Sequence, residues 1–230
     1  MEALISEGGL PDRRIEAVLF DLDGTLIATR RLYLEAYRRT VAPHVGRLLS
    51  DDELLAFDAR SERLLITDCV GAAQLTTFHS RFHDHYEQLH DTHFEGVFPG
   101  VLELLELIRA RGLKTGIVTG KSRGAWRITA ARVQLGDFGV IVVEDDVSAP
   151  KPDAHGLQLA LSALQVEPQR ALYVGDSTVD VKAAVAAGVI PVAALWSRDQ
   201  DRRDQLLRSI SGLPAMSVRT PLEIVSLLAG

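Results

Sequence analysis

Cysteine is nearly absent from this chain, since Cys69 is the single one among 230 residues. A lone cysteine cannot form a disulfide within the chain, which fits a protein of a reducing compartment. We expect Cys69 to act as a small buried apolar residue rather than as a reactive thiol.

Positive charge is also scarce. The 25 lysines and arginines are outnumbered by 31 acidic residues, which gives a net charge of -6 and a pI near 5.6. This balance argues against a nucleic acid or an anionic membrane surface as a partner. A small anionic substrate would then need a local positive site, such as a metal ion together with a lysine.

Long apolar segments are missing as well. The chain has no run of about 18 apolar residues, so we expect no membrane-spanning helix. Residues 1–14 contain acids and no apolar stretch long enough for a signal peptide. Together with the single cysteine, this predicts a cytoplasmic protein.

What the chain does have is enough apolar mass for a core, because 47% of its residues are hydrophobic and 24% are charged. From Val97 onward, strand-like and helix-like segments alternate, which predicts βαβ units and a parallel sheet with helices on both faces. The expected strands are at 15–21, 114–119, 140–143, 171–174, 189–195 and 216–218, and the expected helices at 100–111, 122–135, 153–164, 179–187, in the tail before 216, and from 221.

Residues 26–95 have a different character, because no strand pattern is evident there. We expect helices at 30–45 and 76–93, and another that begins near Ser50 and Asp51 and reaches Phe57. The chain is therefore predicted to form a Rossmann-like α/β core from residues 1–27 and 96–230, with an inserted all-helical cap at 28–95.

Two carboxylates follow the first expected strand directly. The apolar residues 17–20 lead into Asp21 and Asp23, which point the same way from an extended segment, at the edge where α/β sheets place ligands. Two ionised carboxylates repel each other, and Mg²⁺, which prefers oxygen ligands, removes that conflict. Gly24 allows a sharp turn, and Thr25 can hydrogen-bond a carboxylate or the local backbone. By itself the segment also fits a strand followed by an ordinary Asp-Gly turn.

Three further polar segments also follow expected strands. Thr119 and Gly120 stand just before a helix, where free backbone N–H groups bind anions. Prolines on both sides hold Lys151 in a defined loop. Another strand runs into Asp176, with Asp180 four residues later. Helix caps, a first-turn acid or a solvated lysine would explain each segment alone, but all of them fall at one edge of the predicted sheet.

Together these groups predict phosphoryl transfer. A metal held by Asp21 and Asp176 would neutralise a substrate phosphate, and Thr119 with nearby backbone amides would bind its oxygens. Lys151 would place positive charge where the transition state gathers negative charge. One of Asp21 and Asp23 would attack phosphorus and form an aspartyl-phosphate, while the other would protonate the leaving oxygen and later deprotonate water.

The same segments resemble the four motifs of the haloacid dehalogenase-like superfamily. The element Asp21-Leu22-Asp23-Gly24-Thr25, Thr119, Lys151-Pro152 and the run 175–180 follow in the family's order and at its usual spacing. The alanine-rich run 175–188 and the helical insert are similar to the phosphoglycolate phosphatase-like branch, which carries a small α-helical cap. The resemblance implies a Mg²⁺-dependent hydrolase of a small phosphorylated metabolite, either a phosphoglycolate-like compound or a sugar phosphate.

The resemblance also implies a role for each matching residue. Asp21 would be the nucleophile, and Asp23 the general acid and base. Thr119 would bind the phosphoryl group, and Lys151 would hold both the phosphate and Asp21. Asp21, the backbone carbonyl of Asp23 and Asp176 would form the metal site.

Five more positions follow from the same resemblance. Asp180 would lie beside the metal ligands or occasionally be a ligand itself. Gly24, Thr25, Gly120 and Lys121 would contact the substrate. Thr25 after Gly24 matches the phosphatase members of the family.

The chain departs from the family pattern at three places. Gly120 stands where the family often has asparagine, and Ala154 where it often has proline. Residues 196–198 replace a frequent Trp-Gly ending. Weaker side-chain contact with the substrate is expected at Gly120, and a less rigid loop around Lys151.

Other functions are compatible with this scaffold. A phosphosugar mutase would return the phosphoryl group from the aspartate to another hydroxyl, and a pyrophosphatase would cleave a phosphoanhydride. A non-catalytic binding or regulatory protein is a third alternative, against which the intact acidic and basic set argues. Asp23, Asp176 and the Gly-Thr pair suit a phosphate better than an alkyl halide. The expected partner is a small phosphorylated metabolite rather than a nucleic acid or a membrane, and the protein is expected as a monomer or homodimer.

Histidine is concentrated in one segment, since five of the seven lie between His79 and His93. His79 and His83 are four residues apart, a spacing that can chelate zinc from a helix. Because the sequence suggests no third ligand, we expect these histidines to form a solvated or cap-packing face.

Three arginines of the expected cap, Arg30, Arg31 and Arg81, are candidates for binding a distal anionic group of the substrate. Arg30 and Arg31 rank first because they follow the predicted active-site turn directly, although a solvated basic side chain is the default expectation. Trp126 and Trp196 are expected to pack in the core rather than to contact substrate.

Overall fold

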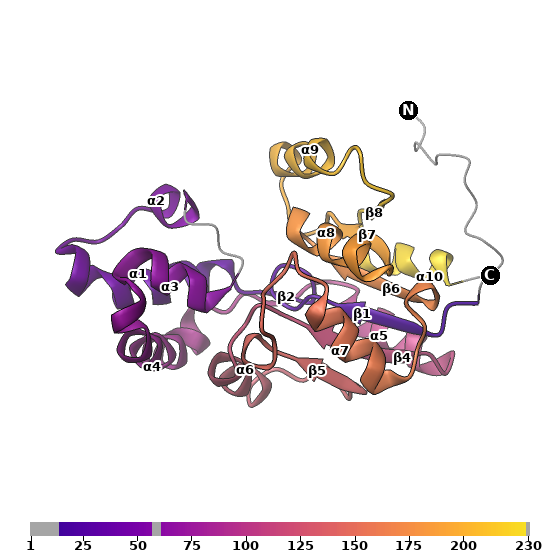
Figure 1. Ribbon diagram of the computed structural model, residues 1–230, viewed down its shortest axis with the longest axis horizontal. Coiled ribbons are helices and arrows are strands. Elements are labelled where there is room, and N and C mark those ends of the chain that lie inside the picture. Colours follow the sequence, from indigo (N-terminus) through magenta and orange to yellow (C-terminus); the bar gives the residue numbers. More distant parts are fainter. Residues whose placement is uncertain (1–13, 57–60, 229–230) are drawn as a thin grey trace.

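The computed structural model describes residues 14–56 and 61–228, and a six-stranded parallel sheet lies at its centre (Figure 1). The strand order is β5-β4-β1-β6-β7-β8. The strands are β1 (Ala17–Phe20), β4 (Lys114–Val118), β5 (Val140–Val142), β6 (Ala171–Gly175), β7 (Ile190–Ala194) and β8 (Met216–Val218). All neighbouring pairs are parallel, which confirms the predicted Rossmann-like sheet.

The central strand β1 is buried on both faces, and its side chains alternate between two cores. Val18 and Phe20 belong to one hydrophobic cluster, while Ala17 and Leu19 belong to another. The first cluster contains residues of helix α5 (Val101–Ala110) and helix α10 (Ile224–Leu227). The second contains residues of helices α7 (His155–Leu164) and α8 (Thr178–Ala187). This double burial explains why β1 is a continuous apolar run.

Two further helices complete the core, α6 (Arg123–Ala130) and α9 (Gln200–Ser209). Helix α6 is shorter than the predicted 122–135, because Val133 and Leu135 leave the helix and pack against the first cluster. Short 3-10 turns occur at Ala72–Gln74, Glu144–Asp146, Pro168–Arg170 and Pro221–Glu223.

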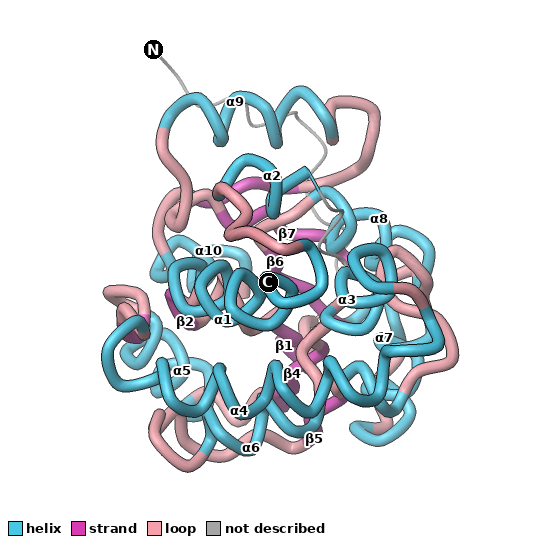
Figure 2. Tube along the Cα trace, turned by 90° about the vertical axis from the view of Figure 1, so that its left-hand side faces the viewer, coloured by secondary structure: helices cyan, strands magenta, loops and turns pink. Residues whose placement is uncertain are grey.

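Four helices lie together beside the sheet, on the left in Figure 1. They are α1 (Arg30–Val45), α2 (Asp51–Ala56), α3 (Glu62–Val70) and α4 (Leu75–His93). They share a hydrophobic cluster of their own, centred on residues such as Phe82 and Tyr86, to which α6 contributes Ala125. Figure 2 looks from the side of these helices and shows the strands behind them. The inserted helical cap is therefore present, while its division from the core at residues 28 and 95 stays a prediction.

The insert begins and ends in a small ribbon that the sequence did not predict. Strands β2 (Ile27–Ala28) and β3 (Gly96–Val97) pair antiparallel. Helix α3 was also not predicted; it begins after Ser61, whose hydroxyl accepts a hydrogen bond from Leu64 N. The expectations for residues 1–13 and for Phe57 lie outside the described residues. Among the described residues, none of the helices is long and apolar enough to cross a bilayer.

Candidate active site

The carboxyl ends of β1, β4, β5 and β6 meet at a cavity of about 500 Å³. Its walls come from the loops after these strands and from helices α1 and α3. The sheet side of the lining includes Asp21, Asp23, Gly24, Thr119, Gly120, Lys121, Lys151, Asp176 and Asp180, and the helical side includes Arg30, Tyr33, Tyr37 and Glu62. Parallel strands place these distant segments at one edge, as the sequence predicted.

Lys151 lies against Asp21 at the bottom of this cavity. Its Nζ donates to Asp21 Oδ1 and to Asp180 Oδ1, both at 2.6 Å, and to the Tyr173 hydroxyl at 3.1 Å. Burial alone would lower the pKa of Lys151, but Asp180 and Asp21 raise it well above its usual value, so the ammonium stays charged. Lys151 is thus the counter-charge of two buried carboxylates.

Asp21, Asp176 and Asp180 form an acidic cluster whose ligand oxygens lie within 4.8 Å of one another. Burial raises the pKa of Asp21 well above its usual value, Lys151 opposes this rise, and the other two acids add to it. Burial also raises the pKa of Asp176 to about 6. Two buried carboxylates and the partly buried one of Asp176 lie together here, faced by Lys151 and Arg198. A divalent cation would relieve the repulsion among the three acids, and hard oxygen donors suit Mg²⁺. The donor set therefore fits the expected metal.

Gly24 allows Asp176 to reach this cluster. Its φ is +83°, and a Cβ added there would lie 2.6 Å from Asp176 Oδ2, closer than real Cβ atoms come. The neighbouring Thr25 does not face the cavity, because it is fully buried and accepts a hydrogen bond from Trp196 Nε1 at its carbonyl, at 2.9 Å. Its hydroxyl has no hydrogen-bond partner within the described chain, contrary to the expected bond to a carboxylate or the backbone.

The side chain of Asp23 turns away from the acidic cluster toward the helices. Its Oδ1 accepts a hydrogen bond from Thr29 Oγ1 at 2.6 Å and lies 3.2 Å from Lys121 Nζ. Lys121 Nζ also donates to the hydroxyls of Tyr33 at 2.6 Å and Tyr86 at 2.8 Å. Lys121 is therefore a buried link between the β4 loop and the cap helices, with its ammonium held against Asp23.

Tyr33 extends this link to a residue that the sequence did not suggest. Its hydroxyl donates to Glu62 Oε1 at 2.6 Å, so Asp23, Lys121, Tyr33 and Glu62 form one connected chain. Glu62 escaped prediction because helix α3 itself was not expected. The local signals for that helix are Ser61, a typical N-cap residue, and the short apolar run at 64–66.

Ser122 and Ser177 are the N-cap residues of the two helices that follow the polar loops. Ser122 caps α6 by accepting from Ala125 N, so Thr119 is not the capping residue, and its Oγ1 accepts from Lys121 N at 3.1 Å. Ser177 caps α8 by accepting a hydrogen bond from Asp180 N, and Asp180 Oδ2 accepts one from Ser177 N at 3.0 Å. Asp180 therefore serves both as a first-turn acid and as a partner of Lys151.

Arg198 is a second residue that the sequence analysis did not single out. Its Nε donates to the Asp176 carbonyl at 2.7 Å, and an Nη lies 3.1 Å from Asp176 Oδ2. With Arg30 and Arg202 it lines the same cavity. Burial lowers the pKa of Arg30, and the nearby charges of Arg202 and Arg198 lower it further. Three positive charges thus gather on one side of the cavity.

The other residues weighed in the sequence have simpler positions. Arg31 lines a separate cavity, and the Arg81 guanidinium lies 5.5 Å above the Phe78 ring. Trp126 and Trp196 pack against the first hydrophobic cluster, as predicted. Cys69 is partly buried, and burial with the nearby Asp68 raises the pKa of its thiol to about 11, which disfavours a reactive thiolate.

Comparison with known proteins gives consistent results. The family model described as haloacid dehalogenase-like hydrolase matches residues 18–194. Pyrophosphatase PpaX of Bacillus cereus is 34% identical over 188 residues, which cover 80% of this chain and 85% of the relative. A Lactobacillus plantarum structure, provisionally assigned as a phosphoglycolate phosphatase, has a TM-score of 0.78 and 27% identity, covering 93% of this chain and 99% of its own. A Thermotoga maritima structure, provisionally assigned as a beta-phosphoglucomutase, has a TM-score of 0.68 and 31% identity, covering 93% and 98%.

Proposed function

Because the chain belongs to the haloacid dehalogenase-like hydrolases, we propose that it is a Mg²⁺-dependent phosphatase acting on a small phosphorylated metabolite through an aspartyl-phosphate. The observation that supports this most strongly is the convergence of Asp21, Asp176 and Lys151 from three separate loops. Lys151 Nζ lies 2.6 Å from Asp21 Oδ1, and the oxygens of Asp21 and Asp176 are close enough to share one ion.

In the first step, an Asp21 oxygen attacks phosphorus while the bond to the leaving oxygen breaks. Lys151, held between Asp21 and Asp180, places positive charge beside the phosphoryl oxygens. Thr119 and the backbone amides near Gly120 bind those oxygens. Mg²⁺, held by Asp21, Asp176 and the carbonyl of Asp23, would supply further neutralisation of phosphate charge.

Asp23 acts as the general acid and then the general base in this proposal. Its carboxyl donates a proton to the leaving oxygen, and in the second step it takes a proton from water, which attacks phosphorus and releases inorganic phosphate and free Asp21. Thr29 and Lys121 fix the position of the Asp23 carboxylate. Because Lys121 is bound to Tyr33 and Tyr86 of the cap helices, the position of Asp23 depends on where these helices lie.

The three arginines favour substrates with a second anionic group. Arg30, Arg198 and Arg202 line the cavity near one another, and Arg198 contacts Asp176. Arginine pairs with carboxylates and phosphates, so these residues suit the carboxylate of a phosphoglycolate-like compound and also the second phosphoryl group of pyrophosphate. Pyrophosphate hydrolysis is therefore the second candidate, which the similarity to pyrophosphatase PpaX also supports. The net charge of -6 and the single cysteine suit a cytoplasmic enzyme of small metabolites.

The test is Asp21→Asn, assayed with pyrophosphate, phosphoglycolate, sugar phosphates and an aryl phosphate, each with Mg²⁺ or with EDTA. We expect turnover to fall by a factor of about 10⁴ or more, because the nucleophile is lost, while the thermal unfolding midpoint changes little. Asp137→Asn, at an exposed loop position, is the matched control and should keep full activity. Full activity of Asp21→Asn would exclude the aspartyl-phosphate. If the wild type isomerised a sugar phosphate without releasing phosphate, it would be a mutase instead.

A further inference from the structure

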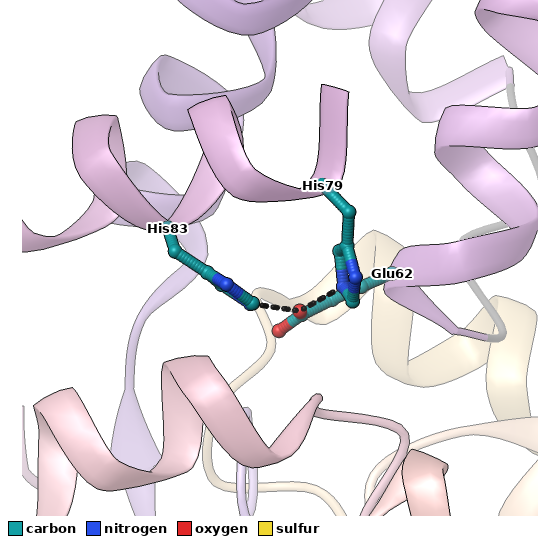
Figure 3. A group of neighbouring side chains, drawn as sticks. All are labelled: Glu62, His79 and His83. Atoms are coloured by element: carbon teal, nitrogen blue, oxygen red, sulfur yellow. Dashed lines mark ion pairs between the residues drawn. The ribbon is translucent and has the colours of Figure 1, made fainter. Parts of the chain in front are cut away.

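A second group of candidate metal ligands lies outside the acidic cluster, between helices α3 and α4 (Figure 3). Glu62 comes from α3, and His79 and His83 stand one turn apart on α4. Glu62 Oε2 lies 3.5 Å from His79 Nε2 and 3.9 Å from His83 Nε2. The third ligand that the sequence did not suggest is therefore supplied by the fold.

Two atoms of this group are buried without a hydrogen-bond partner. Glu62 is 2% exposed, and within residues 14–56 and 61–228 its Oε2 receives no hydrogen bond, nor does His79 Nε2 make one. A buried polar atom that lacks a partner destabilises the folded state, and more so when it is charged. A cation between these atoms would satisfy both.

The separations of 3.5 and 3.9 Å are slightly longer than those around a tetrahedral ion, so small side-chain movements would close the site. Zinc binds imidazole nitrogen and carboxylate oxygen at about 2.0–2.2 Å, so two ligand atoms at the tetrahedral angle lie about 3.3 Å apart. Two histidines and one glutamate leave a fourth position for water. This donor set suits Zn²⁺ better than Mg²⁺, which prefers oxygen ligands and octahedral geometry.

The surroundings hold the ligands in place. The other oxygen of Glu62 accepts the Tyr33 hydroxyl bond at 2.6 Å, which orients the carboxylate. The His83 ring rests on Gly124, where an added Cβ would lie 2.3 Å from His83 Cε1. His83 Nε2 is 2.7 Å from Ser122 Oγ, and Ser122 also caps α6, so that Nε2 can exchange this hydroxyl for an ion while the cap bond from Ala125 N remains.

We propose that Glu62, His79 and His83 bind one divalent transition-metal ion, best matched by Zn²⁺, at a site separate from the acidic cluster. The ion would join α3 to α4. It would also connect to Asp23 through the chain of Glu62, Tyr33 and Lys121. The site does not depend on the proposed reaction, and it is tested by metal binding alone.

The experiment is calorimetric titration of the full chain with Zn²⁺ in the presence of saturating Mg²⁺, together with titration by Co²⁺ followed by visible absorption. The wild type should bind one Zn²⁺, and Co²⁺ should give the strong absorption of a tetrahedral site with nitrogen ligands. His79→Gln and His83→Gln should each lower the Zn²⁺ affinity by about 100-fold or more, since losing a ligand costs more than the 10- to 100-fold cost of losing a supporting contact. Both histidines are partly exposed, so these variants should fold.

His85→Gln is the matched control, because His85 lies on the same helix but its Nδ1 is 3.1 Å from Thr40 Oγ1. It should bind Zn²⁺ like the wild type, and so should Asp176→Asn, which alters the acidic cluster only. The proposal is overturned if no Zn²⁺ binds in saturating Mg²⁺. It is equally overturned if His79→Gln and His83→Gln bind like the wild type, or if Asp176→Asn removes the binding that they retain.

Discussion

The missing side chain of Gly24 decides how closely Asp176 can approach the turn that carries Asp21. In Gly24→Ala, the new Cβ would lie 2.6 Å from Asp176 Oδ2, and a φ of +83° would add strain of about 1–2 kcal/mol. We expect the displaced Asp176 to raise the Mg²⁺ concentration required for half-maximal activity by about tenfold. The Mg²⁺ dependence of phosphate release measures this.

Gly112→Ala is the control for this variant. Gly112 has a similar φ of +70°, but nothing lies within 4 Å of its added Cβ. Both variants should therefore lose a similar free energy of unfolding from backbone strain, whereas Gly24→Ala alone should change the Mg²⁺ dependence. Identical Mg²⁺ curves for the two variants would show that Asp176 does not hold the metal from this position.

Glu144 makes the stability of the protein depend on pH. It is 7% exposed, and burial raises its pKa to about 7, opposed by a hydrogen bond with Ser61 and assisted by Glu62. The folded state holds this proton more tightly than the unfolded chain, where the pKa is near 4.5. The contribution of protonated Glu144 to the free energy of unfolding is therefore fully present below about pH 4.5 and is lost as the pH rises to about 7.

Glu144→Gln should remove this dependence, because an amide has no proton to lose. At about 1.4 kcal/mol per pKa unit, the variant should be more stable than the wild type by about 1–3 kcal/mol at pH 8 and not at pH 4.5. Urea unfolding in EDTA at both pH values measures the difference, with the exposed Glu106→Gln as control. If Glu144→Gln changed the free energy of unfolding by the same amount at both pH values, the pKa of Glu144 would not be raised.

Some residues of the site could be predicted from the sequence because each has a local pattern. Asp21 and Asp176 directly follow apolar strand-like runs, and Lys151 lies between two prolines. Glu62 and Arg198 have no such pattern, and only the packing of α3 and the return of the chain after β7 bring them to the cavity. Local chemistry therefore identified the residues at the strand ends but not those contributed by other elements.

At the scale of elements, burial decided which predictions succeeded. The central strands are buried on both faces, so their apolar runs are unambiguous. Strands β2 and β3 have two residues each, too few to show any period. Helix α3 is nine residues long with only a few buried positions, so its pattern is weak. The end of α6 depends on packing of Leu135 in the core, which no local preference could show.

The helical insert was recognised at the scale of the whole molecule because strand patterns are missing between residues 26 and 95. Its contact with the core was not predicted, since it depends on Lys121 reaching Tyr33 and Tyr86. The Tyr86 hydroxyl also lies 3.0 Å from Thr129 Oγ1 on α6. These polar contacts join the two parts, and Ala125 of α6 adds an apolar contact with the cluster of the insert. The sheet keeps an apolar cluster of its own, formed by strands and helices of the core.

Separate clusters predict that the core folds without the insert. Ala28 pairs with Gly96 across the β2–β3 ribbon, so a two-residue Asn-Gly turn can replace residues 29–95. We expect this shortened chain to unfold in one cooperative transition, with a urea m-value reduced in proportion to the surface removed. It should also lose turnover of small phosphorylated substrates, because Lys121 loses both tyrosine partners. Circular dichroism and urea unfolding measure the first result, and phosphate release the second.

A deletion inside the core provides the comparison. Replacing residues 121–135 with the same turn removes Leu135 from the cluster that packs against β1, although it removes far fewer residues. That chain should lose cooperative unfolding, because removal of α6 and Leu135 exposes apolar core surface that the remaining helices cannot cover. If the chain without residues 29–95 also failed to unfold cooperatively, the sheet would depend on the helical insert, and the division of the chain at residues 28 and 95 would be wrong.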